Sequence, residues 1–424
     1  MKHFFPIIGL LALVLAISCQ KNPDVTGGTD ARFEVPETAP LLTKAQLDMS
    51  NAVYDFGLDM FSRLSDLNQD FIFSPMSLSL ALSLCELGAE GETATQLADV
   101  QGLKNYSQEQ VGAYYQAVVG RLLTADKEVT LSSGNALWAD KTFPVFDSYK
   151  GNLVKYFNAE SFSVDFSDQE AVRLQVNKWG SDHTSNKIPE VLDKKHGGPV
   201  LLTNALYFNA GWGITFDEEL LTAPFYGKAT KDAQYFTKTG PFAYCQTDGC
   251  QFLSIPYGKG LYDFVVVLPD KGKTLADAVT LLQSANGKKA LDLLTAKDGV
   301  IPSGSFTYVQ LPRFEVSSGN KPEAIKNALI AMGAPVPFSP RAQFTRMSPV
   351  SDLSIEDIIQ KAYVSVNEKG TEAAAVTVVE VEFINPGPGG ETAIPQFIAN
   401  RPFLFLIRET GSNTILFIGV KCQA

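Results

Sequence analysis

The residues of this chain best suited to chemistry are its five cysteines and three histidines. Cys245 and Cys250 flank Gln-Thr-Asp-Gly, and the Asp-Gly pair is a strong turn signal, so the spacing predicts a hairpin that a disulfide could bridge. No histidine lies near them, which argues against a zinc site. His183 and His196 stand in polar stretches typical of solvated residues.

Motifs that assemble a catalytic centre are missing. The sequence contains no G-x-S-x-G elbow, H-E-x-x-H helix, phosphate-binding loop or G-x-G-x-x-G turn. The remaining cysteines of the body, Cys85 and Cys422, stand in apolar runs and are expected to be packed in the core. The sequence therefore favours a protein that is not an enzyme and needs no metal or cofactor.

A third kind of chemistry is indicated at the amino terminus. Residues 1–18 combine an early lysine with an apolar run that is too short to span a membrane, which is typical of a signal peptide. Leu15-Ala16-Ile17-Ser18-Cys19 resembles a bacterial lipoprotein signal, in which the cysteine is acylated. We therefore expect an exported protein held to a bacterial membrane by a lipid on Cys19; the alternative is an ordinary signal with a chance cysteine.

Composition restricts the remaining classes. The net charge is −11 and the sequence pI is about 4.9, without a basic cluster, so the chain is not expected to bind nucleic acid. Residues 19–40 are polar and rich in glycine and proline, as in a flexible tether. Residues 41–424 contain no repeat and no clear linker, and we expect them to form a single domain.

The periodicity of this domain indicates an α+β fold. Helical spacing of apolar residues predicts a helix over Leu42–Leu67 and a second, more buried helix over Ser77–Leu97. Strands are expected at Leu201–Phe208, Phe264–Leu268, Thr307–Leu311, Tyr363–Val366 and Phe403–Ile407. Helices dominate the first third and strands the remainder.

The most unusual segment is residues 371–383, Thr-Glu-Ala-Ala-Ala-Val-Thr-Val-Val-Glu-Val-Glu-Phe. Its odd positions carry no charge, whereas its even positions hold all three glutamates, which suits a strand with one buried face. The simplest interpretation is a permanent strand. However, the first half is small enough to slide between neighbouring strands, and a Pro/Gly-rich loop over 386–395 follows the second half.

Residues 368–375, Glu-Lys-Gly-Thr-Glu-Ala-Ala-Ala, resemble the hinge of inhibitory serpins, a family of protease inhibitors. The resemblance extends over roughly residues 45–424. Further motifs in family order are Phe73–Leu78, Leu87–Thr93, Asn135–Trp138, Val164–Phe166, Asn177–Thr184, Lys187-Ile188, Asn204–Trp212, Leu311–Phe314 and Arg401–Arg408.

This resemblance implies the serpin fold, with three β-sheets, about eight or nine helices and an exposed reactive loop over about 368–398. It implies that a target protease cuts the loop and is trapped as an acyl-enzyme when the cut arm inserts into the main sheet. The hinge residues would be Glu368, Gly370, Thr371, Ala373, Ala374 and Ala375. The odd face would be the one buried by insertion, so Thr371 is expected to pass from solvent into the sheet.

By the same resemblance, cleavage would fall at Phe383–Ile384 or Ile384–Asn385. No lysine or arginine occurs from Gly370 to Asn400, so elastase-, chymotrypsin- or subtilisin-like targets fit better than trypsin-like ones. The segment after the bond is longer than in typical members. Gln360 stands where many members carry histidine.

Three other functions remain open. A non-inhibitory serpin-fold binding protein is the main alternative, although such hinges usually carry bulky or charged residues or proline. A secreted hydrolase lacks its motifs, and a purely structural surface lipoprotein would not need this hinge. The expected partners are a target protease and a membrane, and the chain is expected to be a monomer.

Overall fold

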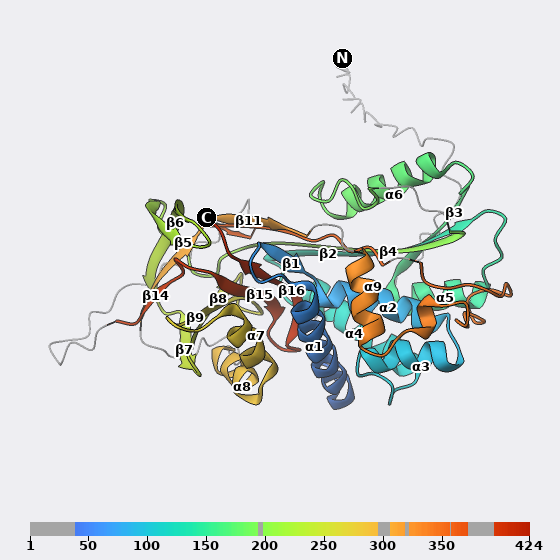
Figure 1. The fold of residues 1–424 in the computed structure, drawn as a ribbon, viewed down its shortest axis with the longest axis horizontal. Helices are drawn as coiled ribbons and strands as arrows, with labels where there is room; N and C mark the ends of the chain where they lie inside the picture. The colour runs from blue at the N-terminus through green and yellow to red at the C-terminus, as the bar shows by residue number, and fades with distance from the viewer. Residues whose placement is uncertain (1–38, 194–197, 296–305, 319–321, 357, 372–393) are drawn as a thin grey trace, which may run out of the picture.

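The computed structural model describes residues 39–424 except 194–197, 296–305, 319–321, 357 and 372–393. Within these residues it holds nine α-helices, one short 3-10 helix and strands in three sheets (Figure 1), so the predicted α+β fold with three sheets is confirmed. No helix in the described part of the chain is long and apolar enough to cross a membrane.

The helices are α1 Lys44–Leu64, α2 Pro75–Leu87, α3 Gly91–Val100, α4 Gln108–Thr124, α5 Asp147–Phe157, α6 Gln169–His183, α7 Leu275–Gln283, α8 Ala285–Leu294 and α9 Pro322–Ala331, with the 3-10 helix at Val336–Phe338. The strands are β1 Phe71–Phe73, β2 Val129–Asp140, β3 Ala159–Val164, β4 Val200–Gly211, β5 Leu221–Tyr226, β6 Thr230–Gly240, β7 Ala243–Thr247, β8 Cys250–Tyr257, β9 Tyr262–Pro269, β10 Thr307–Pro312, β11 Phe314–Ser317, β12 Tyr363–Asn367, β13 Gly370–Thr371, β14 Gln396–Ile398, β15 Phe403–Glu409 and β16 Thr414–Lys421.

The first predicted helix is confirmed with shorter ends, and the second is divided. A capping box between Thr43 and Gln46 starts α1. The helix expected over Ser77–Leu97 is two helices, α2 and α3, because Gly91 has a φ of +57°, which an α-helix does not allow. Each of the five predicted strands lies within β4, β9, β10, β12 or β15.

Six strands form the main sheet, in the order β11-β12-β13-β4-β2-β3. Its centre is the long antiparallel pair of β2 and β4, which runs from Val129 opposite Ala210 to Ala139 opposite Val200. A second sheet has the order β1-β16-β15-β9-β8-β7, and a small sheet has the order β14-β10-β6-β5. The main sheet is therefore the longest surface available for an additional strand.

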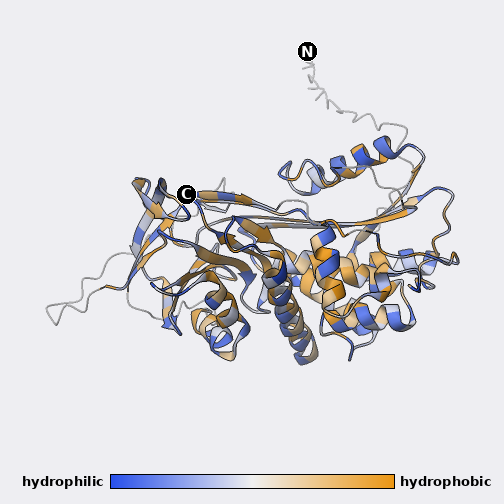
Figure 2. Cartoon of the chain, viewed as in Figure 1, coloured by the Kyte–Doolittle hydropathy of each residue, from blue (hydrophilic) through white to orange (hydrophobic). Residues whose placement is uncertain are grey.

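The two faces of the main sheet have different neighbours. Helix α6 lies over one face, where Leu201 and Ala205 of β4 join a small cluster around Trp138 and Trp179. The alternate residues Leu206, Phe208 and Ala210 point into the main core on the side of α2. Hydrophobic residues concentrate around α2 (Figure 2), which is buried along nearly its whole length.

Candidate functional site

The site begins where the chain enters the main sheet as β13. Gly370 and Thr371 lie between β12 and β4, with Thr371 opposite Val366 on one side and Ala210 on the other. Gly370 has a φ of +148°, which favours glycine and allows the tight reversal from β12. Two residues of the predicted hinge are thus already paired as a strand.

Thr371 is buried, with 1% of its surface exposed, and its hydroxyl shares a hydrogen bond with the hydroxyl of Tyr257 in β8. Burial raises the pKa of Tyr257 well above its ordinary value, so that hydroxyl stays protonated. The prediction that Thr371 must pass from solvent into the sheet is therefore wrong. Alternation identified its buried face correctly but could not show that it already lies in the sheet.

Trp212 fixes the turn that precedes β13. Its indole N–H donates to the carbonyl of Asn367 at 2.8 Å, and its backbone N–H donates to the carbonyl of Lys369 at 3.1 Å. The ring stacks on Tyr257 with centroids 4.6 Å apart. A continuous aromatic support therefore runs beneath the hinge from β4 to β8.

Glu368 ties the same turn to the junction of β10 and β11. Its carboxylate accepts two hydrogen bonds from the Arg313 guanidinium, one of them from Nε at 2.6 Å. Burial raises the pKa of Glu368, but the hydrogen bonds and the charge of Arg313 outweigh it and leave the pKa below its ordinary value. The carboxylate is thus held ionised against Arg313.

Gln360 binds the segment before β12 to the start of α2. Its side-chain amide donates to the carbonyl of Ser74 at 2.8 Å, and its oxygen accepts from the backbone N–H of Ser74 at 3.1 Å. The Ser74 hydroxyl caps α2 by accepting from the backbone N–H of Ser77 and donates to the carbonyl of Leu416 at 2.7 Å. The residue that departs from the family pattern therefore makes a complete polar contact with one peptide group.

The rest of the predicted site lies outside the described residues. This applies to the hinge residues Ala373, Ala374 and Ala375, to the reactive bond at Phe383, Ile384 and Asn385, and to Cys19. The chain leaves the main sheet at Thr371 and returns at β14, which pairs with β10 in the small sheet. The hinge and this return strand bracket the proposed loop at one end of the molecule (Figure 1).

The disulfide that the spacing of Cys245 and Cys250 allowed is not formed in this structure. Both cysteines are free thiols on the predicted hairpin of β7 and β8. Cys245 lies opposite Phe252 and Cys250 opposite Thr247, so the two are diagonal neighbours and not a directly opposed pair. Burial raises the pKa of the Cys250 thiol to about 11.

The histidine that the structure describes, His183, has a structural environment. Its Nε2 lies 3.0 Å from the Glu160 carboxylate, and its Nδ1 lies 2.8 Å from the carbonyl of Trp179. These contacts hold the end of α6 against β3. No group of three or more metal-binding side chains occurs in the described part of the chain.

Comparison with known proteins identifies the family. The model of the family "Serpin (serine protease inhibitor)" matches residues 51–423. The chain belongs to the serpin family. It is 32% identical to intracellular coagulation inhibitor 2 of Tachypleus tridentatus, over 88% of this chain and 90% of that protein. It is also 32% identical to the leukocyte elastase inhibitor of Bos taurus, over 88% of this chain and 98% of that protein.

Solved structures agree on the serpin fold. The native state of the thermophilic serpin tengpin matches with a TM-score of 0.77 at 24% identity, covering 91% of this chain and 96% of that one. Human thyroxine-binding globulin complexed with thyroxine matches equally, with a TM-score of 0.77 at 24% identity over 89% and 99% of the two chains. Membership of this serpin family supports protease inhibition in general, and the fold also serves a binding protein.

Sequence reasoning found the hinge but missed the residues that hold it. Trp212 and Arg313 stood inside family motifs without an assigned contact. Tyr257 gave no signal, because the residue that it binds lies 114 positions away in the chain.

Proposed function

We propose that this serpin is an inhibitory one, a suicide substrate that traps endopeptidases. The observation that carries the proposal is the register of β13. Gly370 opposite Gly211 and Thr371 opposite Ala210 both sum to 581, and continuation of this register places Ala373 opposite Phe208 and Val379 opposite Leu202. Small and then apolar odd-face residues would meet the core-facing side of β4.

The length of β4 supports the proposed cleavage position. Its 12 residues, Val200–Gly211, would pair with residues 370–381 in that register. Glu382 and Phe383 would then extend just past the end of β4. A cut at Phe383–Ile384 or Ile384–Asn385 thus leaves an arm that spans the whole sheet.

In the proposed reaction, the serine oxygen of the protease attacks the carbonyl carbon of Phe383 or Ile384. An ester forms and the peptide C–N bond breaks, and the new amine takes a proton and leaves with the carboxyl-terminal segment. Insertion of the arm then adds backbone hydrogen bonds and buries side chains such as Val379 and Val381, each worth roughly 1.5–3 kcal/mol. The uncut chain is accordingly held short of its most stable state by kinetics.

The sequence of the loop favours elastase-, chymotrypsin- or subtilisin-like targets, because no basic residue stands between Gly370 and Asn400. We further propose that the chain is exported and anchored to a bacterial membrane by a lipid on Cys19. The polar segment over residues 19–40 would separate the inhibitor from the membrane.

The decisive experiment mixes the protein with a panel of these proteases and analyses the products on a denaturing gel. Inhibition predicts a covalent complex that survives boiling in detergent, together with loop cleavage at Phe383 or Ile384. Cleavage without such a complex would support the non-inhibitory binding protein instead.

A further inference from the structure

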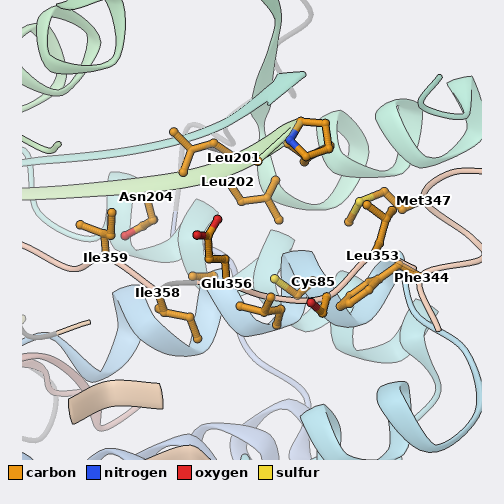
Figure 3. Close-up of a pocket in the computed structure, with 16 residues that line it drawn as sticks. Cys85, Leu201, Leu202, Asn204, Phe344, Met347, Leu353, Glu356, Ile358 and Ile359 are labelled. Carbon is orange, nitrogen blue, oxygen red and sulfur yellow. The ribbon is translucent and has the colours of Figure 1, made fainter. Parts of the chain in front are cut away.

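A cavity of about 130 Å³ lies beneath the main sheet, away from the hinge. Figure 3 shows it between the first residues of β4, the segment that precedes β12, and α2. Most of its lining is apolar, including Leu201, Leu202, Phe344, Met347, Leu353 and Ile358. Ala81 and Cys85 of α2 also line it.

The size and lining of this cavity define an occupant. An apolar cavity of about 150 Å³ in another protein stays dry and binds benzene, so this one matches a single aromatic ring. Of its polar side chains, Asn204 is engaged, because its Nδ2 donates to Asn135 at 2.8 Å and its Oδ1 accepts from Ser77. Glu356 is exposed and forms no ion pair with any residue that the structure describes.

We propose that this cavity binds a small aromatic amine, with the ring among the apolar side chains and the ammonium against Glu356. An amine of this kind combines the two properties that the lining offers, an apolar body and a compensating positive charge. An aromatic acid would place a second negative charge beside Glu356 and is excluded.

The position of the cavity gives such a ligand a regulatory effect, a step that rests on the proposed inhibitory function. The two walls are β4 and the segment leading to β12, which are the strands between which β13 already lies. In the register of β13, Thr377 would come opposite Asn204 and Val379 opposite Leu202. Both partners line the cavity, so the occupant and the inserting arm compete for one space.

The binding test uses benzylamine and toluene on the uncut protein, followed by ligand-observed NMR. Wild type is expected to bind both, with benzylamine tighter. Glu356→Gln should weaken benzylamine about threefold, the effect of an exposed ion pair, and leave toluene unchanged. Glu323→Gln, at an exposed acid on α9, is the matched control and should change neither. Ala81→Leu should fill the cavity and remove both.

The functional test measures the fraction of cut inhibitor that ends as covalent complex. Saturating benzylamine should lower that fraction about twofold or more in wild type and leave it unchanged in Ala81→Leu. A peptide substrate measures any direct effect of benzylamine on the protease.

Three results would overturn the proposal: no saturable binding to wild type, equal binding to Ala81→Leu, or an unchanged fraction of complex at saturation. If no protease is trapped even without benzylamine, the inhibitory function fails and the competition with it. The binding arm, measured on the uncut chain, still decides whether the aromatic-amine site exists.

Discussion

Arg313 and Glu368 form a two-pronged ion pair that joins the β10–β11 junction to the residue before the hinge turn. Only 14% of the Glu368 side chain is exposed, so the carboxylate is partly shielded from water. The pair connects the main sheet to the small sheet beside the point where the loop leaves. It therefore holds the turn between β12 and β13 in place.

Reversal of one charge in this pair should loosen the turn. Glu368→Lys is expected to lower the free energy of unfolding by about 2 kcal/mol, because a charged hydrogen-bonded pair becomes a repulsive one. Urea unfolding of wild type and variant measures the difference. Arg313→Glu combined with Glu368→Lys should recover most of the loss; if the double variant is no more stable than the single one, the pair is not the cause.

The same carboxylate should contribute to the pH dependence of stability. Burial raises the pKa of Glu368 but Arg313 lowers it further, to below the ordinary value of 4.5. A group with a lowered folded pKa stabilises the protein above its unfolded pKa, and that contribution disappears as the pH falls through the folded pKa. Glu368→Gln should therefore be less stable than wild type at pH 7, and the difference should shrink below about pH 4.5. A difference that is constant from pH 7 to pH 3 would contradict this.

The hydrogen bond between Tyr257 and Thr371 should be measurable by a double-mutant cycle. Tyr257→Phe and Thr371→Val each leave a buried hydroxyl without its partner and should each cost about 1 kcal/mol in free energy of unfolding. The double variant should cost less than the sum, because neither hydroxyl then remains. Strict additivity would show that the two hydroxyls are not coupled.

Gln360 offers a test of the contact between the segment before β12 and α2. Gln360→Leu keeps the volume but removes two hydrogen bonds to Ser74, whose buried peptide group is left unsatisfied. We expect a loss of about 2–3 kcal/mol in free energy of unfolding. Gln310→Leu, at a buried residue of β10, is a control for replacing a glutamine within a sheet. Equal losses in both variants would remove any special role for Gln360.

Anchoring should depend on the sulfur of Cys19. Cys19→Ala is expected to abolish metabolic lipid labelling and to move the protein out of the membrane fraction. A chain that begins near Ala31 should inhibit normally, because the helical body starts at Lys44. Labelling that survives the substitution would disprove the lipid site.

These residues show what the sequence could and could not predict. Alternation identified the strands β4, β9, β10, β12 and β15, since periodicity reports the local direction of side chains. It could not show that Thr371 is already paired, because a strand has the same pattern before and after it joins a sheet. Partners such as Tyr257 and Ser74 are brought together by the fold across more than 100 positions, which no local pattern records.

The burial of Thr371 makes the hinge the most informative place for a substitution. Arginine there would put a charge into a space where the native side chain is 1% exposed and touches Tyr257, and an unpaired buried charge is costly. We expect Thr371→Arg to release β13 from between β12 and β4, so the arm must insert from its first residue against that cost. An added barrier of about 1.4 kcal/mol slows insertion about tenfold, and deacylation then overtakes it.

Thr371→Arg should consequently turn the protein from inhibitor into substrate: cleavage near Phe383 or Ile384 persists while the covalent complex disappears. Thr371→Val, which is similar in size and uncharged, is the matched control and should still trap the protease. The cleaved arginine variant should also gain less heat resistance than cleaved wild type, because its arm stays out of the sheet. A yield of complex equal to that of wild type would mean that β13 is not the start of a working insertion.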